Sequence, residues 1–421
     1  KVRSRWKCRS DRRQTYNHDL SHETRPAHQR PRFHREVEML RILSNRMVQV
    51  FMLVTLLGSL TVFRFADPPV IKHWRDLTFD WYNQLMPREP GDGVVIVDID
   101  EDSLRHKGQW PWPRTLIGEL PVILKEMGAK SVAFDMVFAE PDRTSPPTLA
   151  NNLKNIPNAE SAQKLLRSLP DNDESFAKEI LRAGNVVMGF VVTGDPPGTD
   201  VIVKKDIIWD QGRSKDFPVD FFPKRRYYTN SLPVIVEAAA GNGSFTPEID
   251  KDAVLRRIYT VMGREGQAKN MHGYPALSLE ALRVSQGDSV AYYIHTRSGA
   301  AGHGIKDITV GQYTIPTDKD GGIRVYYSKG QRPDLFIPAW QLLSKEVDPL
   351  KIKDKIVLIG TSAVGLLDMR SSALGDNVPG ARMHAEVIEQ VMDKKFLIRP
   401  DSFNGVEGAV SVGISLGIIF L

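Results

Sequence analysis

The chain has 421 residues, enough for one large domain or two ordinary ones, and its 41% hydrophobic and 25% charged residues are typical of a folded globular protein. Its only cysteine is Cys8, which excludes an intramolecular disulfide and a metal site built on several cysteines. The net charge of +5 is unevenly distributed. Residues 1–46 hold 13 Lys and Arg against 5 Asp and Glu, whereas the remaining residues hold 43 against 46. The protein therefore has a basic head and a mildly acidic body.

Residues 47–63, "MVQVFMLVTLLGSLTVF", contain no charged side chain. A stretch of this length is at the short end of what a helix needs to cross a membrane, so we predict a transmembrane helix over 47–65. A cleaved signal peptide or a buried core helix is the less favoured alternative. The excess of basic residues before the run predicts that residues 1–46 form a cytoplasmic tail, rather than a nucleic-acid-binding arm.

A second apolar run, "GVEGAVSVGISLGIIFL", occupies 405–421 and is rich in the small residues that favour close helix packing in membranes. We predict that a second transmembrane helix starts within 403–421. The chain begins with Lys1 and ends inside this run, so we expect it to be a fragment of a longer protein. Residues 66–402 would then lie outside the cytoplasmic membrane, with the lipid bilayer as one partner and no nucleic acid.

Between these runs, helical and strand patterns alternate. Val94–Asp98 and Ser131–Val137 read as strands joined by a helix over Pro113–Met127, which predicts a parallel βαβ unit. Further signals are a helix at about 174–183, a strand at Asn185–Val192, a long excursion at 194–232, mixed signals at 274–285 and 308–328, a strand at 355–361 and a helix at 381–393. The predicted fold is one large α/β domain with a mixed, largely parallel sheet, helices on its faces and flanking transmembrane helices.

The segment "VVIVDIDEDS" at 94–103 places carboxylates at the end of a predicted strand. A calcium loop beginning at Asp98 would need Gly and Glu where the chain has Ser103 and Gln109, so that reading fails. A Mg²⁺-dependent phosphatase of the haloacid-dehalogenase type, with Asp98 as nucleophile and Asp100 as acid/base, remains an alternative. It is weak, because no lysine and paired aspartates complete the set.

Asp135 adds a carboxylate to the next predicted strand and would face Asp98 near the carboxyl edge, where open α/β sheets bind ligands. The alternative is that both carboxylates accept hydrogen bonds from backbone amides at helix starts. Arg114, in "WPWPR", would pair with one of these acidic strand ends.

The segment "GTSAVGLLD" at 360–368 follows the strand at 355–361 and offers amides and hydroxyls to an anion, while His384 would approach the same edge. The sequence thus predicts no catalytic set and no cofactor, and leaves a metal site open. The candidate ligand-binding residues are Asp98, Asp100, Arg114, Asp135, Thr361, Asp368 and His384.

Several separate blocks resemble one family in the order expected of it. They are "VVIVDIDEDSL", "GQWPWPR", "GAKSVAFDMVF", "DKDAVLRRI", "GYPALSLEAL", "IPTDKDGGIRVYY", "KIVLIGTSAVGLLD", "VPGARMHAEVIEQ" and "FLIRP". Together they resemble the CHASE type 2 domain, the cyclase/histidine-kinase-associated sensory extracellular module of bacterial receptors. The likeness covers about residues 70–400. The chain departs from the family at Ala253, where a Gly is common, and in "MRSSALGDN", which lacks an expected proline.

The resemblance implies a receptor in which this domain passes a stimulus to a cytoplasmic output, most often an adenylate or guanylate cyclase, otherwise a kinase or diguanylate cyclase. It also implies an unknown extracytoplasmic ligand and a homodimer formed through the flanking helices. Besides the phosphatase, an interaction module of the cell envelope that binds no small ligand is a further alternative.

Overall fold

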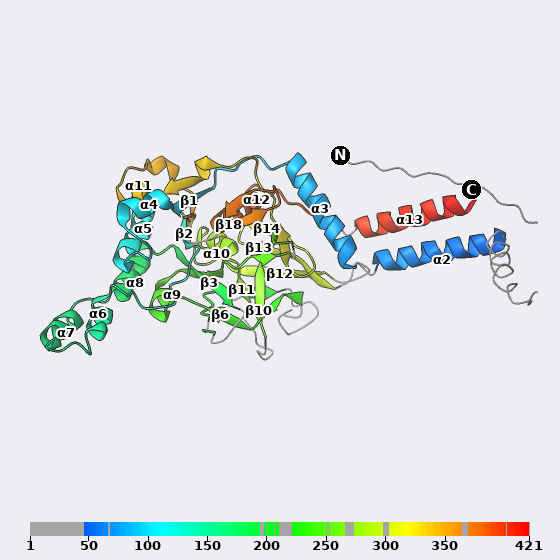
Figure 1. Ribbon diagram of the computed structural model, residues 1–421. Helices are drawn as coiled ribbons and strands as arrows, with labels where there is room; N and C mark the ends of the chain where they lie inside the picture. Colours follow the sequence, from blue (N-terminus) through cyan, green and yellow to red (C-terminus); the bar gives the residue numbers. More distant parts are fainter. Residues whose placement is uncertain are drawn as a thin grey trace, which may run out of the picture. The chain divides into compact units, whose positions relative to one another are not determined.

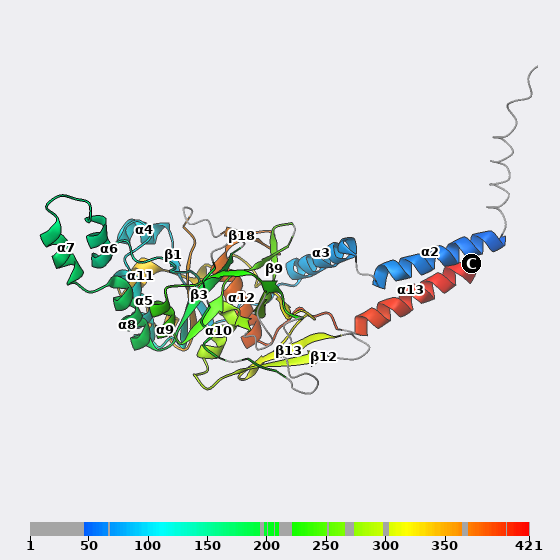
Figure 2. The same cartoon turned by 90° about the horizontal axis from the view of Figure 1, so that it is seen from below.

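The computed structural model describes residues 46–65, 68–193, 198–199, 201–205, 207–209, 221–250, 252–265, 273–297, 303–363, 369–400 and 402–420. The chain divides into two units, one formed by Lys1–Asp67 with Asn404–Leu421 and the other by Pro68–Phe403. The first unit contains α2 (Arg46–Phe65) and nearly all of α13 (Ser402–Phe420), drawn side by side in Figures 1 and 2. In the part of the chain described, no helix has both the length and the apolar character that a membrane crossing requires, so the two expected transmembrane helices are not confirmed. The predicted tail lies almost entirely outside the described residues.

The second unit is built on a seven-stranded sheet with the order β16-β1-β17-β2-β3-β6, in which β7 also pairs with β3. All pairings in it are parallel except that of β3 with β6. Its strands are β1 (Val94–Ile99), β2 (Ser131–Phe134), β3 (Val186–Thr193), β6 (Tyr227–Thr229), β7 (Gly241–Ser244), β16 (Phe336–Pro338) and β17 (Ile356–Thr361).

Helices cover both faces of this sheet, which explains why β1 reads as a continuous apolar run rather than an alternating one. Val95 and Val97 of β1 point into a core shared with α5 (Arg114–Glu126) and α8 (Asn172–Ala183). Val94 and Ile96 point into the opposite core, shared with α10 (Leu277–Val284) and α12 (Gly380–Met392). The unit is therefore a three-layer α/β/α arrangement around the central sheet (Figure 1).

Three smaller sheets accompany the central one, so the prediction of one large sheet is only partly right. Local hairpins, segments of the predicted excursion and pairings between distant segments all contribute to them. Their strands are β5 (Lys224–Arg225), β10 (Val261–Arg264) and β11 (Tyr274–Pro275); β4 (Ile207–Trp209), β12 (Tyr292–Arg297), β13 (Gly304–Val310) and β14 (Tyr313–Pro316); and β8 (Glu248–Ile249), β9 (Val254–Tyr259), β15 (Gly322–Arg324), β18 (Met369–Ser372) and β19 (Asn377–Pro379).

The remaining helices lie at the periphery of this unit. Both views show α6 and α7 projecting from the side that carries α8 (Figures 1 and 2). The helices not yet given are α3 (Pro69–Leu85), α4 (Glu101–Lys107), α6 (Pro146–Asn152), α7 (Glu160–Arg167), α9 (Pro233–Ala238) and α11 (Ala339–Leu343), with 3-10 turns η2 (Pro333–Leu335) and η3 (Pro349–Lys351).

Candidate functional site

The carboxyl edge of the central sheet brings Asp98 and Asp135 close together, but not on neighbouring strands. The predicted βαβ unit is parallel, yet β17 from the C-terminal part of the chain inserts between β1 and β2. Asp98 pairs in register with Gly360 of β17, and a Cβ at Gly360 would lie 3.8 Å from Asp135 Oδ2. It would also lie only 2.6 Å from Ala381 Cβ, so a side chain at Gly360 has no room. The two carboxylates thus flank a glycine.

Asp98 is buried at this edge, and within the part of the chain that the structure describes its carboxyl group forms no ion pair. Its Oδ2 accepts a hydrogen bond from Ser362 Oγ at 2.6 Å. Burial raises the pKa of the Asp98 carboxyl to about 6; the nearby Asp100 raises it further, while the bond from Ser362 opposes the change. Asp98 therefore titrates near neutral pH, as carboxyl groups at functional sites often do.

Asp100 has a structural role at the start of a helix, and its predicted ligand role stays a prediction. Its Oδ1 accepts a hydrogen bond from the backbone N–H of Ser103 at 2.7 Å and thereby caps α4. Across the described ranges, no three His, Cys, Asp or Glu side chains are grouped so that they could hold a metal ion.

Arg114 does not pair with an acidic strand end, and that prediction is wrong. It lies at the start of α5, where its Nε is 3.3 Å from Asp173 Oδ1 and its backbone N–H donates to Asp142 Oδ2 at 2.8 Å. Its guanidinium also lies 4.4 Å above the Phe138 ring. Burial lowers the pKa of Arg114, against the charges of both aspartates. The acids come from the loop after β2 and from α8, which sequence spacing could not indicate.

The remaining candidates divide between the edge and the core. Thr361 ends β17 opposite Ile99 and is half-buried, whereas its neighbour Ser362 makes the contact to Asp98. His384 lies in α12 with its Nε2 3.2 Å from the Phe245 carbonyl oxygen, to which it donates. Burial lowers the pKa of the imidazole to about 4, against the effect of that carbonyl. Asp368 falls outside the described residues.

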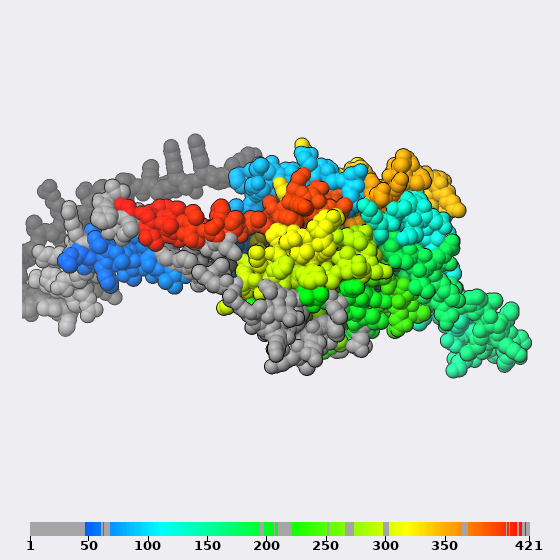
Figure 3. Space-filling view, turned by 180° about the vertical axis from the view of Figure 1, so that it is seen from behind, coloured from blue at the N-terminus to red at the C-terminus, as the bar shows by residue number. Residues whose placement is uncertain are grey.

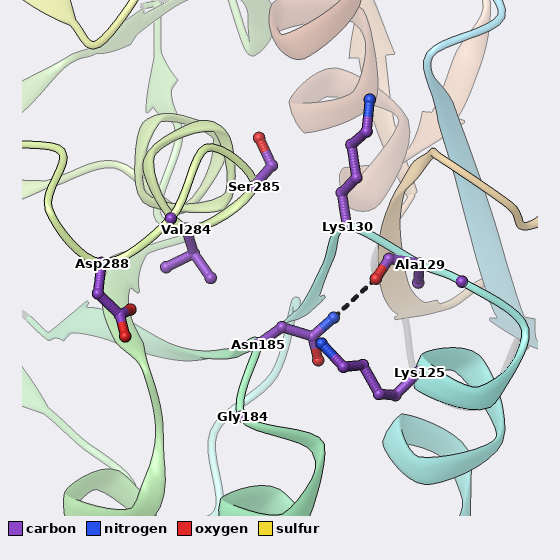
Figure 4. Close-up of a pocket in the computed structure, with 10 residues that line it drawn as sticks. Lys125, Ala129, Lys130, Gly184, Asn185, Val284, Ser285 and Asp288 are labelled. Atoms are coloured by element: carbon purple, nitrogen blue, oxygen red, sulfur yellow. Dashed lines mark hydrogen bonds between the residues drawn. The ribbon is translucent and has the colours of Figure 1, made fainter.

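A cavity of about 430 Å³ opens at the opposite edge of the sheet (Figure 4). It lies where β2 and β3 begin and where α5, α8 and α10 end. Asn185 donates from Nδ2 to the Ala129 carbonyl at 2.8 Å, and Lys125 extends toward it in Figure 4. None of the predicted site residues lines this cavity, so it is distinct from the carboxyl edge.

The sequence reading missed a buried layer of ion pairs, here called the charge layer: Arg88, Arg332, Arg382, Glu386 and Glu389. Arg88 Nη2 lies 2.8 Å from Glu386 Oε2 and 2.6 Å from Glu389 Oε2, and Arg332 Nη1 lies 3.0 Å from Glu389 Oε2. Burial lowers the pKa of Arg88, but hydrogen bonding and charge from the two glutamates outweigh it and leave the pKa raised. The layer joins the segment after α3 to α12, about 300 positions later in the chain.

Two neighbouring acids on α3 make a second buried contact with the domain. Asp80 receives a bidentate hydrogen bond from Arg256, with Nη2 to Oδ2 at 2.7 Å, and Asp76 accepts from Arg324 at 2.7 Å and Arg257 at 3.3 Å. The spacing of Asp76 and Asp80 places them on one face of α3, a signal that sequence reading could have used. The arginines come from β9 and β15, and their identity as partners could not be read from the sequence.

The sequence matches the family profile described as the CHASE2 domain over residues 50–420. The chain belongs to the CHASE2 domain family. CHASE2 domains are sensory, non-catalytic parts of signalling receptors, and the match confirms the resemblance found in the sequence blocks. No curated protein and no solved structure matches the chain. The functional features of this CHASE2 domain must therefore be read from its own geometry, above all from the charge layer, the buried contacts of α3 and the carboxyl edge.

Proposed function

We propose that this CHASE2 domain senses a stimulus and passes it to an output domain through the segments on either side of it, as part of a one-component membrane receptor. The single observation that carries the proposal is the charge layer. Arg88 belongs to the segment that enters the sheet from α3, and Glu386 and Glu389 belong to α12, which leads to α13. A stimulus that displaces one of these segments must therefore also displace the other or break buried ion pairs.

The energetic requirement for signalling is small. A ligand needs only a different affinity for two arrangements of the domain to shift their populations. Breaking one buried ion pair costs several kcal/mol because a charge is left without its partner. The charge layer therefore favours discrete rearrangement over gradual deformation, which suits a domain that has to report a state.

We place the stimulus at the carboxyl edge, where Asp98, Asp135, Thr361 and Ser362 meet at the ends of three parallel strands. This is the position at which parallel α/β sheets bind ligands. Because the pKa of Asp98 is raised to about 6, its carboxyl group gains or loses a proton near neutral pH, and a bound cation would favour the ionised form. Asp100 and Arg114 are omitted, because both are committed to helix starts.

The proposed location is outside the cytoplasmic membrane, and it is supported by the basic composition of residues 1–46 ahead of an apolar run. Protease treatment of spheroplasts carrying a tag within the domain tests it. The proposal predicts that added protease cleaves residues 68–403 in intact spheroplasts. Cleavage only after lysis would contradict an extracytoplasmic domain.

The proposed output is an adenylate or guanylate cyclase, with a kinase or diguanylate cyclase as the alternative. Sequencing the complete gene tests which output is encoded with this domain, and cyclic AMP made by the intact protein in a cyclase-deficient bacterium measures cyclase activity. Glu389→Gln removes one charge from the charge layer, and we expect it to change basal cyclic AMP about fivefold or more, the lower range of allosteric coupling.

Asp102→Asn is the matched control, because it makes the same acid-to-amide change in an exposed ion pair with Arg105. It should leave cyclic AMP unchanged. Equal effects of the two variants, or none from a folded Glu389→Gln protein, would contradict a route through the charge layer.

A further inference from the structure

The two faces of α3 are reversed relative to an ordinary surface helix. The face against the domain carries Asp76, Asp80 and Asn83, all buried, with the two aspartates held by the arginine pairs described above. The face turned away from the domain carries five large apolar residues. They are Val70, Trp74, Leu77, Trp81 and Leu85, and all are exposed. A surface helix normally buries its apolar stripe and exposes its polar one.

The exposed residues follow the spacing of a coiled-coil seam. Positions 70, 74, 77 and 81 are separated by four, three and four residues, and at 3.6 residues per turn all five side chains fall within an arc of roughly 80°. Trp74 and Trp81 are 67% and 64% exposed. Large exposed apolar patches of this kind mark interaction sites.

We propose that this stripe is a dimer interface, formed by α3 packing along α3 of a second copy of the chain. A 4-3-4 stripe is self-complementary, because each copy offers the knobs and holes that the other needs. The pairing would bring four tryptophans into one seam. Since a buried aromatic side chain covers roughly 150–250 Å², the seam reaches the order of 1,000 Å² at which specific interfaces begin.

A membrane surface fits α3 less well. A helix lying on a bilayer keeps its polar face in water, whereas the polar face of α3 is occupied by the domain through Arg256 and Arg324. Polar His73, Thr78 and Gln84 are exposed at the margins of the stripe, and Tyr82, which is 44% exposed, lies beyond Thr78. In Figure 3 the light blue segment that contains α3 lies on the surface of the domain, next to the orange-red segment of α12.

Cysteine cross-linking of the 421-residue chain in a mild detergent tests the interface. In a Cys8→Ser background, Leu77→Cys places a thiol in the seam. Lys72→Cys places one on the same helix, also exposed but on the far side of the stripe. Under mild oxidation we expect the Leu77→Cys protein to form a covalent dimer with about tenfold higher yield than the Lys72→Cys protein.

A second measurement removes the seam. Each of Trp74→Glu and Trp81→Glu should weaken dimerisation roughly 30-fold, as expected for buried aromatic anchors, and the double variant should sediment as a monomer with an unchanged melting temperature. Equal yields from Leu77→Cys and Lys72→Cys, or a double variant that remains dimeric, would overturn the proposal. A wild-type protein that is monomeric would also overturn the proposal, whether or not it binds phosphatidylcholine–phosphatidylglycerol vesicles through the tryptophans. The dimer interface is independent of the proposed output. A dimer would support the interface even if the protein had no cyclase activity, and cyclase activity would not support the interface if the cross-link failed to form.

Discussion

The carboxyl edge and the charge layer are both polar and buried, but they handle charge in opposite ways. At the edge, Asp98 accepts a hydrogen bond from a serine hydroxyl, and in the core His384 donates to a backbone carbonyl; among the described residues, neither side chain forms an ion pair. Burial therefore shifts each pKa toward the neutral form. In the charge layer, Arg88 lies against the side chains of Glu386 and Glu389, and hydrogen bonds and charge from these glutamates raise the pKa of Arg88 despite its burial.

This difference separates a region whose charge can respond to a stimulus, the carboxyl edge, from a region that holds two segments of the chain together, the charge layer. A group whose charge changes near neutral pH can register a proton or an ion at little cost, whereas a paired buried charge resists change because separation leaves it unsatisfied. We therefore assign reception to the carboxyl edge and cohesion of the two flanking segments to the charge layer. Variants in the two regions should therefore change the free energy of unfolding by different amounts and with a different dependence on pH.

The largest effect should follow Arg88→Met. It leaves Glu386 and Glu389 buried with fewer compensating charges, and we expect the free energy of unfolding to fall by about 3–5 kcal/mol. Urea unfolding monitored by fluorescence measures it. Arg105→Met is the matched control, since it breaks an exposed pair with Asp102 and should cost no more than about 1 kcal/mol. Similar losses of unfolding free energy in both variants would contradict the distinction between the buried charge layer and an exposed ion pair.

His384→Gln should alter the acid limb of the stability curve. The folded pKa of about 4 lies below the ordinary 6.5, so the unfolded chain binds the proton more readily and the wild type loses stability as pH falls from about 6.5 toward 4. Gln keeps a donor for the Phe245 carbonyl and does not titrate. Between pH 7 and pH 4.5 we expect the variant to lose about 2–3 kcal/mol less than the wild type. Parallel curves would show that His384 is not held neutral.

Asp98→Asn should have the opposite dependence. Because the folded pKa of about 6 lies above the ordinary 3.8, the carboxyl favours the folded state below about pH 3.8 and that contribution disappears as pH rises through 6. Asn can still accept from Ser362, so the variant should be about 1–3 kcal/mol more stable than the wild type at pH 7.5, with the gain shrinking toward pH 4. A destabilised variant at pH 7.5 would indicate that the ionised carboxylate has a partner in solution.

Ala253→Gly is the smallest change and tests a backbone feature away from both regions. Ala253 adopts φ of +63° in the turn between β8 and β9, at the position where the family commonly has Gly. Relief of the left-handed strain, less the added freedom of glycine in the unfolded chain, should raise stability by roughly 0.5–1 kcal/mol. Thermal melting measures it, and a lower melting temperature would contradict the assignment of strain.

Local patterns predicted the elements well where one helix or strand could be recognised alone. The strands β1, β3 and β17 and the helices α5, α8 and α12 lie close to their predicted ranges, while β2 ends at Phe134 rather than at Val137. Periodicity and apolar runs fix these elements because each must bury one face or both. The smaller sheets were not separated from the central one, since their strands carry weak local signals.

Long-range pairing was the part that the sequence could not supply. The insertion of β17 between β1 and β2, the pairing of Arg114 with Asp173, and the contact of Arg88 with Glu389 each join segments whose spacing carries no signal. Of the predicted site residues, the structure brings Asp98, Asp135 and Thr361 to one edge. It assigns Asp100 to a helix cap and places His384 in the core.

The central claim is that the charge layer couples the segment after α3 to α12, and a double-mutant cycle between Arg88 and Glu389 tests it most directly. The free energy of unfolding is measured for Arg88→Met, Glu389→Gln, the double variant and the wild type. If the two residues act as one unit, the cycle should give a coupling energy of about 1–3 kcal/mol. Losses that add to within about 0.5 kcal/mol would show independent residues and contradict the claim.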